Sequence, residues 1–286
     1  MQKIQITTDS TCDLSKELIE KYNIKQIPLA VITDEEHLDG VDYFPADIFS
    51  YVQSTKKLPK TAARSITDFE DFFKPMLDEG YDIVHIGIGK ELSGSYNNAC
   101  QAAANVGNGH VFVVDSASLS TGTGLLVIAG AEMIAAGKTA EQIAKTLTER
   151  AAFVQASFVV DTLDYLRKGG RCSALAAFGA NLLRIKPRLQ VIDGKIANNG
   201  KYMGKLVPVL KKYIDDELKA YPNMDKKRCF VTHASLDEQS VSEIVEYVKS
   251  KNIFAEVLTT CAGSTITSHC GPNTLGILYI NDGDKQ

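Results

Sequence analysis

The sequence predicts an α/β protein in two parts. The first is a βαβ domain with a mainly parallel sheet at residues 1–155, and the second is an α+β domain at residues 156–286. In the first half, short β-rich runs alternate with amphipathic helical stretches, which is typical of parallel βαβ units. In the second half, Asp193-Gly194 separates two β-rich runs and indicates a hairpin. A length of 286 residues suits two domains.

Each element of the first half rests on local periodicity and turn signals. Ser10 or Asp13 is the expected cap of the first helix. Pro75 predicts a kink or break in the third helix, and a polar loop is expected at 54–65. The expected strands are 3–8, 27–32, 82–88 and 111–114, and the expected helices are 14–22, 44–53, 68–79, 93–105, 122–135 and 140–153.

The second half mixes the two kinds of element. Gly169-Gly170 is expected to stop a short helix in the left-handed conformation. His269 falls in a turn-like segment that ends at Pro272. The expected strands are 157–160, 187–192, 195–197, 228–232, 255–259 and 274–280, and the expected helices are 175–183, 206–218 and 237–249.

Composition excludes several classes of function. With 31 basic and 35 acidic residues, the net charge of −4 argues against a broad nucleic-acid footprint. No apolar stretch is long enough to span a bilayer. No export signal is visible, so the six cysteines are expected to be reduced thiols in a cytoplasm. Their spacing matches no metal motif, and we expect no metal site.

Two strands are expected to end alike, in Asp9-Ser10 and in Asp115-Ser116. Ligands of open α/β sheets bind beyond the carboxyl ends of the strands. These four residues and the loop at 89–94 are therefore one candidate rim. The alternative is that Asp and Ser act there only as caps.

Ser93 follows a strand and a Gly-rich loop and is expected to open a helix, which makes its surroundings a candidate anion site. The alternative is that Ser93 or Ser95 merely caps that helix. His85 lies inside an apolar strand and is expected in the core, whereas His269 is the better site candidate. Arg171 belongs to a basic cluster at the end of a helix. The sequence contains neither a phosphate-binding loop nor a nucleophile elbow.

Seven segments together resemble the DegV family of bacterial lipid-binding proteins, in the family's order and over nearly the whole chain. They are residues 8–14, 27–29, 92–97, 114–116, 161–171, 185–187 and 269–276. The chain departs from the family at two places. It reads Thr61-Ala62-Ala63-Arg64-Ser65 where the family usually has Thr-Ser-Gln-Pro-Ser, and Met203 stands where kinase-coupled members have Arg.

The resemblance implies a protein that holds one long-chain fatty acid between two domains, without a cofactor and without catalysis of its own. Thr61 and Ser93 would hold the carboxylate, and Arg171 and His269 would lie near it. Arg64 could bring a further cation to the head group. The implied partner is an ATP-binding fatty acid kinase subunit, which phosphorylates the bound acyl chain for phospholipid synthesis.

Two other functions stay open. The first is a hydrolase or transferase at the strand-end rim, with Ser93 or Ser10 as nucleophile and His269 as base. That chemistry needs a base within hydrogen-bond reach of the serine. The second is a regulatory or structural module in which the lipid serves only as a folding ligand.

Overall fold

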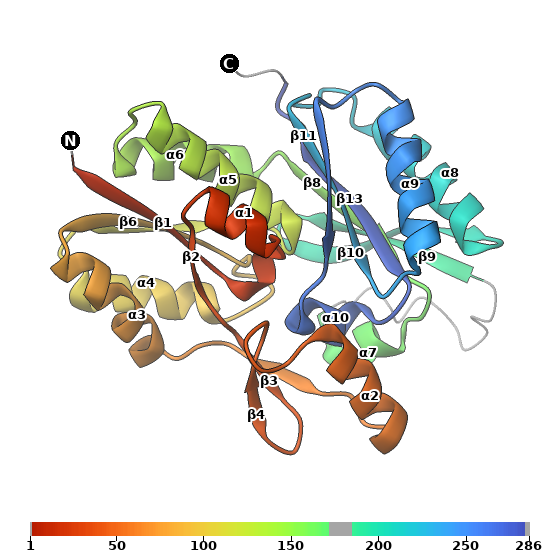
Figure 1. The fold of residues 1–286 in the computed structure, drawn as a ribbon, viewed down its shortest axis with the longest axis horizontal. Coiled ribbons are helices and arrows are strands. Elements are labelled where there is room, and N and C mark those ends of the chain that lie inside the picture. The colour runs from red at the N-terminus through yellow and green to blue at the C-terminus, as the bar shows by residue number, and fades with distance from the viewer. Residues whose placement is uncertain (1, 172–184, 284–286) are drawn as a thin grey trace.

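The computed structural model describes residues 2–171 and 185–283. Its N-terminal sheet has the strand order β2-β1-β6-β7, and all three pairings are parallel, as the sequence predicts. Figure 1 shows this sheet on the left and a second sheet on the right, with α5 (Thr121–Ala135) between them. The strands are β1 (Lys3–Asp9), β2 (Lys25–Ile27), β6 (Tyr81–Gly87) and β7 (Val111–Asp115).

Helices cover both faces of this sheet. On one face, α3 (Ile66–Asp78) and α4 (Ser95–Val106) enclose a core that includes Phe69 and Phe73. On the other lie α5 and α6 (Ala140–Ala151). Because α5 packs against both sheets, its residues 121–130 are all buried.

The C-terminal sheet is mixed, with the order β10-β9-β8-β13-β11-β12. Only the pair β11–β12 is parallel. Asp193 and Gly194 form the predicted hairpin turn, both with positive φ. The helices α8 (Leu206–Ala220) and α9 (Glu238–Ser250) pack over the sheet. The strands are β8 (Val154–Val159), β9 (Ile185–Ile192), β10 (Lys195–Met203), β11 (Arg228–Ala234), β12 (Glu256–Cys261) and β13 (Thr274–Ile280).

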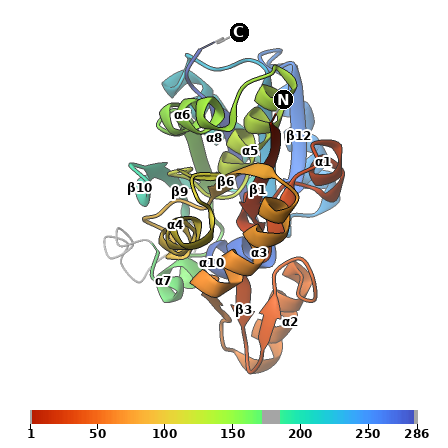
Figure 2. The same cartoon turned by 90° about the vertical axis from the view of Figure 1, so that its left-hand side faces the viewer.

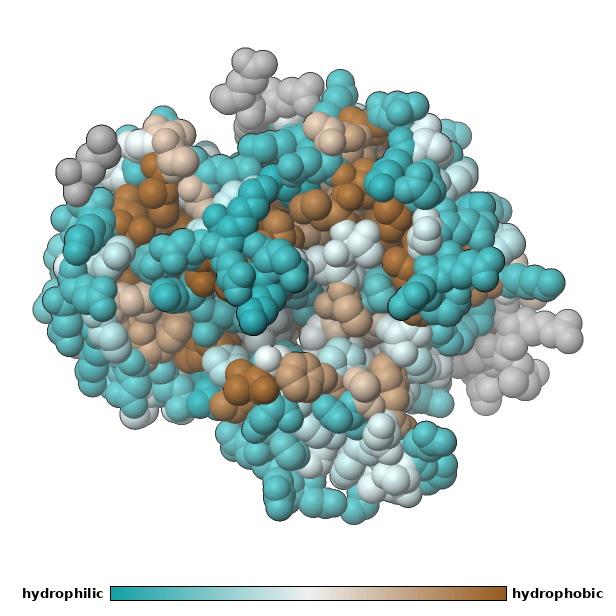
Figure 3. Space-filling view, viewed as in Figure 1, coloured by the Kyte–Doolittle hydropathy of each residue, from teal (hydrophilic) through white to brown (hydrophobic). Residues whose placement is uncertain are grey.

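A small insert follows β2 and projects from the body of the molecule (Figures 1 and 2). It contains the antiparallel sheet β4-β3-β5 and one helix, α2. Figure 3 shows a mostly hydrophilic surface in which hydrophobic residues collect where the insert meets the body. The elements of the insert are β3 (Ala30–Ile32), β4 (Glu36–Leu38), α2 (Pro45–Thr55) and β5 (Lys60–Ala62).

The insert corrects two predictions. The single strand expected at 27–32 is two strands in different sheets, β2 and β3, on either side of Pro28. Proline cannot donate to a strand ladder, and the next amide, of Leu29, donates to Ser10 Oγ at 3.0 Å instead. The loop expected at 54–65 contains β5, which has only three residues and therefore little periodicity to reveal it.

Three further predictions about helices are corrected by the structure. The first helix, α1 (Lys16–Lys21), is capped by Ser15, since both Ser10 and Asp13 are buried in other contacts. Helix α3 continues through Pro75, so the expected break is wrong and the kink stays a prediction; Pro75 and Asp71, the residue whose carbonyl it frees, are both exposed. His269 lies in a helix, α10 (Ser264–Cys270), and not in a turn. The helix expected at 175–183 lies outside the described residues.

The main core joins both halves of the chain. Ile6 and Val84 of the N-terminal sheet belong to the same buried cluster as Phe158 and Leu278 of the C-terminal sheet. The predicted division near residue 155 coincides with the start of β8, and it stays a prediction. Among the described residues, no helix is both long enough and apolar enough to cross a bilayer.

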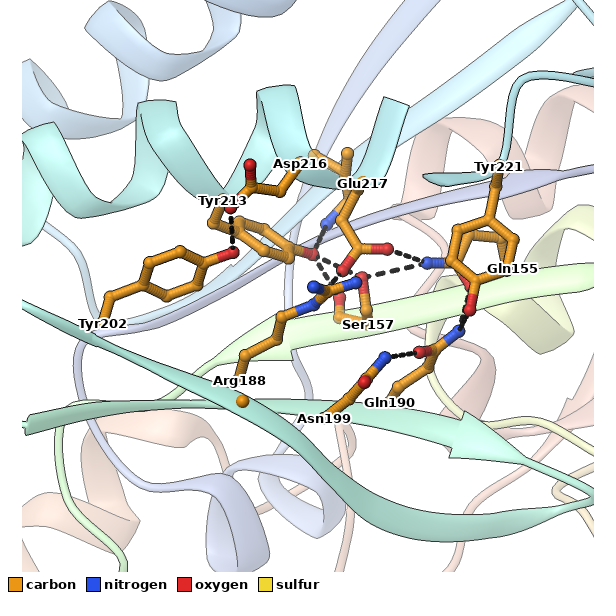
Figure 4. Close-up of polar contacts among 12 residues, drawn as sticks. Gln155, Ser157, Arg188, Gln190, Asn199, Tyr202, Tyr213, Asp216, Glu217 and Tyr221 are labelled. Atoms are coloured by element: carbon orange, nitrogen blue, oxygen red, sulfur yellow. Dashed lines mark hydrogen bonds and ion pairs between the residues drawn. The ribbon is translucent and has the colours of Figure 1, made fainter. Parts of the chain in front are cut away.

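A buried polar network lies under α8 (Figure 4). Glu217 is fully buried and pairs with Arg188 of β9. It also accepts a hydrogen bond from Gln155 of β8, and Tyr213 donates to the Ser157 carbonyl at 2.7 Å. Because its polar groups bond to one another, we interpret this network as the tie between α8 and the sheet.

Candidate functional site

Two adjoining cavities lie between the insert, α10 and the carboxyl edge of the N-terminal sheet. The first, the head-group pocket, is lined by all four predicted site residues: Thr61, Ser93, Arg171 and His269. The second, the tail cavity, is lined mainly by strands of the C-terminal sheet and by α10, with Leu119 and Ser120 from the loop after β7. The two cavities adjoin each other, because four residues line both: Leu119, Ile196, Ile266 and His269.

Thr61 and His269 form the centre of the head-group pocket. Thr61 lies on β5, and its Oγ1 is 2.8 Å from Nε2 of His269 on α10. Burial, with a smaller contribution from the charge of Arg171, lowers the pKa of His269 to about 4. The ring is therefore neutral at pH 7 and carries one N–H.

Gly169 makes room for the imidazole. It ends α7 (Asp164–Gly169), and a Cβ at this position would collide with Nδ1 of His269. Of the two glycines expected to stop this helix, only Gly170 has the left-handed conformation, with φ of 69°. The double glycine therefore serves both the turn and the site.

Ser93 lies in the loop after β6, two residues before α4 begins. Its Oγ accepts a hydrogen bond from the Ser95 amide at 3.2 Å and donates to Ser95 Oγ at 3.2 Å. The predicted start of this helix at Ser93 is therefore two residues too early. Ser93 nevertheless lines the head-group pocket. The residue before α4 is Gly94, and the Ser93 hydroxyl accepts from the first amide of the helix, so the capping alternative holds in part for Ser93.

Arg171 marks the outer end of the pocket. Its side chain is exposed, and Nη1 donates to the Gly169 carbonyl at 2.8 Å. Together with Leu92 and Ile196, Arg171 also lines an outer cavity at the surface, to which Lys195 contributes a second cation. Glu91 lines the outer cavity as well and lies 3.4 Å from Lys195, whereas Arg171 lines both the outer cavity and the head-group pocket.

The tail cavity is apolar although hydroxyl residues line it. Thr232 Oγ1 lies 2.6 Å from Thr121 Oγ1 and 3.1 Å from Thr260 Oγ1, so these hydroxyls satisfy one another. The rest of the wall is largely apolar and includes Phe158, Leu166, Ala234, Ala262, Gly276 and Leu278. Sequence reasoning did not find this wall, because small and apolar strand residues carry no local signal of a cavity.

Of the predicted rim, only the loop at 89–94 reaches the cavities, through Leu92 and Ser93. Asp9 accepts hydrogen bonds from the Ile88 amide at 2.8 Å and from Thr11. Asp115 accepts from the amides of Lys90 at 3.1 Å and Ala117 at 2.9 Å. Neither these residues nor Ser10 and Ser116 line the two cavities as described. The capping alternative is confirmed for Asp9, Asp115 and Ser116, whereas Ser10 bonds to distant residues.

Two buried carboxylates hold the start of α10. Asp13 accepts from the Gly263 amide at 2.8 Å, and Asp39 accepts from the Ser264 amide at 2.7 Å. Burial raises the pKa of Asp13 well above its usual value. Sequence reasoning missed both residues as part of the site, because their partners lie more than 200 residues away in the chain.

Arg64 does not bring its charge to the head group. Its guanidinium lies 3.0 Å from Asp68 and 3.5 Å from Glu36, and the residue is not among those that line the head-group pocket. The neighbouring Ala62 and Ala63 do line it. The departure from the usual loop therefore leaves Thr61 in place and makes this wall more apolar.

Comparison with known proteins finds a matching family model and full-length relatives. The family model described as "Uncharacterised protein, DegV family" matches residues 3–282. A protein of Thermotoga maritima named "Fatty acid-binding protein" is 31% identical, and the alignment covers 96% of each chain.

Solved structures agree with that comparison. The structure of a DegV family protein of Thermus thermophilus, described by its fatty acid binding, has a TM-score of 0.90 at 28% identity and covers 98% of this chain and 100% of that one. A stearic acid-binding protein of Eubacterium ventriosum has a TM-score of 0.83 at 28% identity, with 98% of each chain covered. These matches confirm the fold that the sequence predicts.

Proposed function

Because the chain belongs to the DegV family, we propose that it binds one long-chain fatty acid as a non-catalytic carrier. The carboxyl group lies in the head-group pocket, and the acyl chain extends into the tail cavity. The observation that carries this proposal is that a pocket holding the polar side chains of Thr61, Ser93 and His269 adjoins a cavity whose wall is largely apolar. That is the shape of an amphipathic ligand with one polar end.

The tail supplies the affinity. Burying about 14 methylenes at ~0.8 kcal/mol each gives roughly 11 kcal/mol of transfer free energy. Ordering of the chain and loss of its motion offset a large share of this. Sub-micromolar binding needs more than about 8 kcal/mol in total, so hydrogen bonds to the carboxyl group must add to what remains.

The hydroxyls of Thr61 and Ser93 are the proposed partners of the carboxylate. Neutral His269 has one N–H, and if Nε2 carries it, that N–H donates to Thr61 Oγ1. The hydroxyl hydrogen of Thr61 is then free to donate to the ligand. His269 is therefore proposed as a positioning residue, and Arg171 favours the ionised form of the carboxyl group.

We also propose that the carboxyl end is presented to an ATP-binding fatty acid kinase subunit, which converts it to an acyl phosphate. The outer cavity beside Arg171 and Lys195 supports this, because it leads from the head-group pocket to the surface. Met203, the position at which the resemblance implies an Arg in kinase-coupled members, is 71% exposed. This departure favours the second candidate, a regulatory module whose lipid has a structural role.

Serine chemistry is not proposed. In the described part of the chain, His269 Nε2 is bonded to Thr61, and its Nδ1 has no partner that would orient the ring as a base. Ser93 is bonded to Ser95, and Ser10 is buried against Asp39 at 2.8 Å. The cytoplasmic location expected from the sequence stays a prediction.

Titration of delipidated protein with stearate tests the carrier function. We expect sub-micromolar binding by the parent and a loss of about tenfold for Thr61→Val or Ser93→Ala, since a hydrogen bond to a charged group contributes about 1.5–3 kcal/mol. Thr148→Val is the matched control, because its exposed hydroxyl donates only to the Ala144 carbonyl. Parent-like binding by both site variants would show that the carboxylate lies elsewhere.

The kinase step has a separate test. Stearate-loaded protein is incubated with ATP and a fatty acid kinase subunit, and acyl phosphate is measured. Product formation supports presentation to a kinase. Tight stearate binding without any product, even with Met203→Arg, would favour the regulatory module.

A further inference from the structure

Helix α10 carries four hydroxyl side chains, and three of them are satisfied by the backbone. Ser264 Oγ donates to the Tyr43 carbonyl at 2.7 Å, Thr267 Oγ1 to the Ala262 carbonyl at 3.2 Å, and Ser268 Oγ to the Ser264 carbonyl at 2.8 Å. The fourth, Thr265, is only 5% exposed. Its Oγ1 is buried and has no hydrogen-bond partner among the described residues.

Thr265 is also the hydroxyl residue of α10 that lines the head-group pocket, together with Thr61 and Ser93. It precedes His269 by four residues, so the two side chains lie on the same side of the helix, with Cβ atoms about 6 Å apart. His269 in turn contacts Thr61. The unpartnered hydroxyl therefore lies about one helical turn from the centre of the pocket.

An unpartnered buried hydroxyl is unfavourable by about 1–3 kcal/mol. Valine has nearly the same shape and would avoid this cost. A carboxylate has two oxygens and about four acceptor positions. It can therefore accept from a third hydroxyl in addition to the two already assigned.

We propose that Thr265 is a third ligand-binding hydroxyl. It donates from α10 to the carboxyl group of the bound fatty acid. This inference rests on the proposed fatty acid binding and extends it to a residue that the motifs of the sequence did not indicate. It also explains why one hydroxyl of α10 differs from the other three.

The test uses the full chain, delipidated, with stearate as the probe. Thr265→Val is compared with Thr267→Val, the matched substitution at a satisfied hydroxyl on the same helix. Two quantities are measured: the urea midpoint without lipid and the dissociation constant for stearate. Thr265→Ser, which restores a hydroxyl, is the third variant.

For Thr265→Val we expect a lipid-free protein at least as stable as the parent and a dissociation constant raised about tenfold. Thr265→Ser should recover most of the affinity. Thr267→Val should lower the urea midpoint and leave the dissociation constant near that of the parent. A purely structural hydroxyl at position 265 would not give these opposite signs.

Parent-like stearate affinity in Thr265→Val would overturn the role of Thr265 while leaving fatty acid binding intact. A fall in lipid-free stability equal to that of Thr267→Val would also overturn it, because the hydroxyl would then have a partner in the protein. Failure of the parent itself to bind stearate would overturn the proposed function and this inference together.

Discussion

Thr61 Oγ1 lies 2.8 Å from Nε2 of His269, which joins a strand of the insert to a helix near the C-terminus across 208 positions of sequence. This contact brings the insert and α10 together around one pocket. It also ties the protonation of His269 to the availability of the Thr61 hydroxyl.

His269→Gln should flatten the pH dependence of stability. The folded pKa of His269, about 4, is below the value of about 6.5 for an unfolded imidazole. Its contribution to the free energy of unfolding is therefore complete above pH 6.5 and is lost as the pH falls toward 4, by at most ~1.4 kcal/mol per pH unit. Urea unfolding at several pH values compares the two proteins. Equal slopes between pH 6.5 and 4 would contradict a neutral buried His269.

Asp13→Asn should be tolerated at neutral pH, whereas Asp13→Ala should not. Burial raises the folded pKa of Asp13, so its contribution to stability is present at low pH and is lost as the pH rises through that folded value. The asparagine side chain can accept from the Gly263 backbone N–H and donate to Ser120 Oγ. Asparagine also tolerates the positive φ of 50° at this position. Thermal unfolding at pH 7 and stearate binding check both variants. If Asn is as damaging as Ala, the ionised carboxylate is required.

Arg188→Met should destabilise the protein by about 3–5 kcal/mol, because it leaves Glu217 buried without its cation. Arg188→Met combined with Glu217→Gln should recover much of this loss, since no net charge then stays buried. Chemical unfolding measures all three proteins. A double variant that is no more stable than the single one would show that Glu217 does not depend on Arg188.

Ala234→Leu should shift the preferred ligand to a shorter acyl chain. Ala234 is fully buried and lines the tail cavity, and leucine adds three carbon atoms there. Each methylene that no longer fits loses about 0.8 kcal/mol. The measurement is the ratio of stearate to myristate affinity within one variant, with the exposed Ala220→Leu as control. A ratio equal to that of the parent would place the end of the acyl chain elsewhere.

Local patterns were sufficient to predict much of the fold. The apolar run that forms β13 was predicted at its observed bounds, because a fully buried strand leaves a continuous signal in the sequence. The Asp193-Gly194 turn was predicted from its dipeptide. Elements of three residues, such as β3 and β5, were not separated correctly, because they are too short to show a period.

Some residues of the site were predicted from the sequence and others were not. Thr61, Ser93, Arg171 and His269 were predicted through the family resemblance, and the structure brings all four to one pocket. Asp13, Asp39 and Thr265 were not found. Their importance depends on contacts made only when α10 packs against the N-terminal half, and no periodicity of either segment encodes those contacts.

Native mass spectrometry of the purified protein, followed by denaturation and lipid analysis, tests the central claim most directly. Carriage of one fatty acid predicts an adduct of roughly fatty-acid mass that is released on unfolding and is depleted in Thr61→Val and Ser93→Ala. A mass equal to that of the bare chain, together with no uptake of added stearate or oleate, would contradict the account.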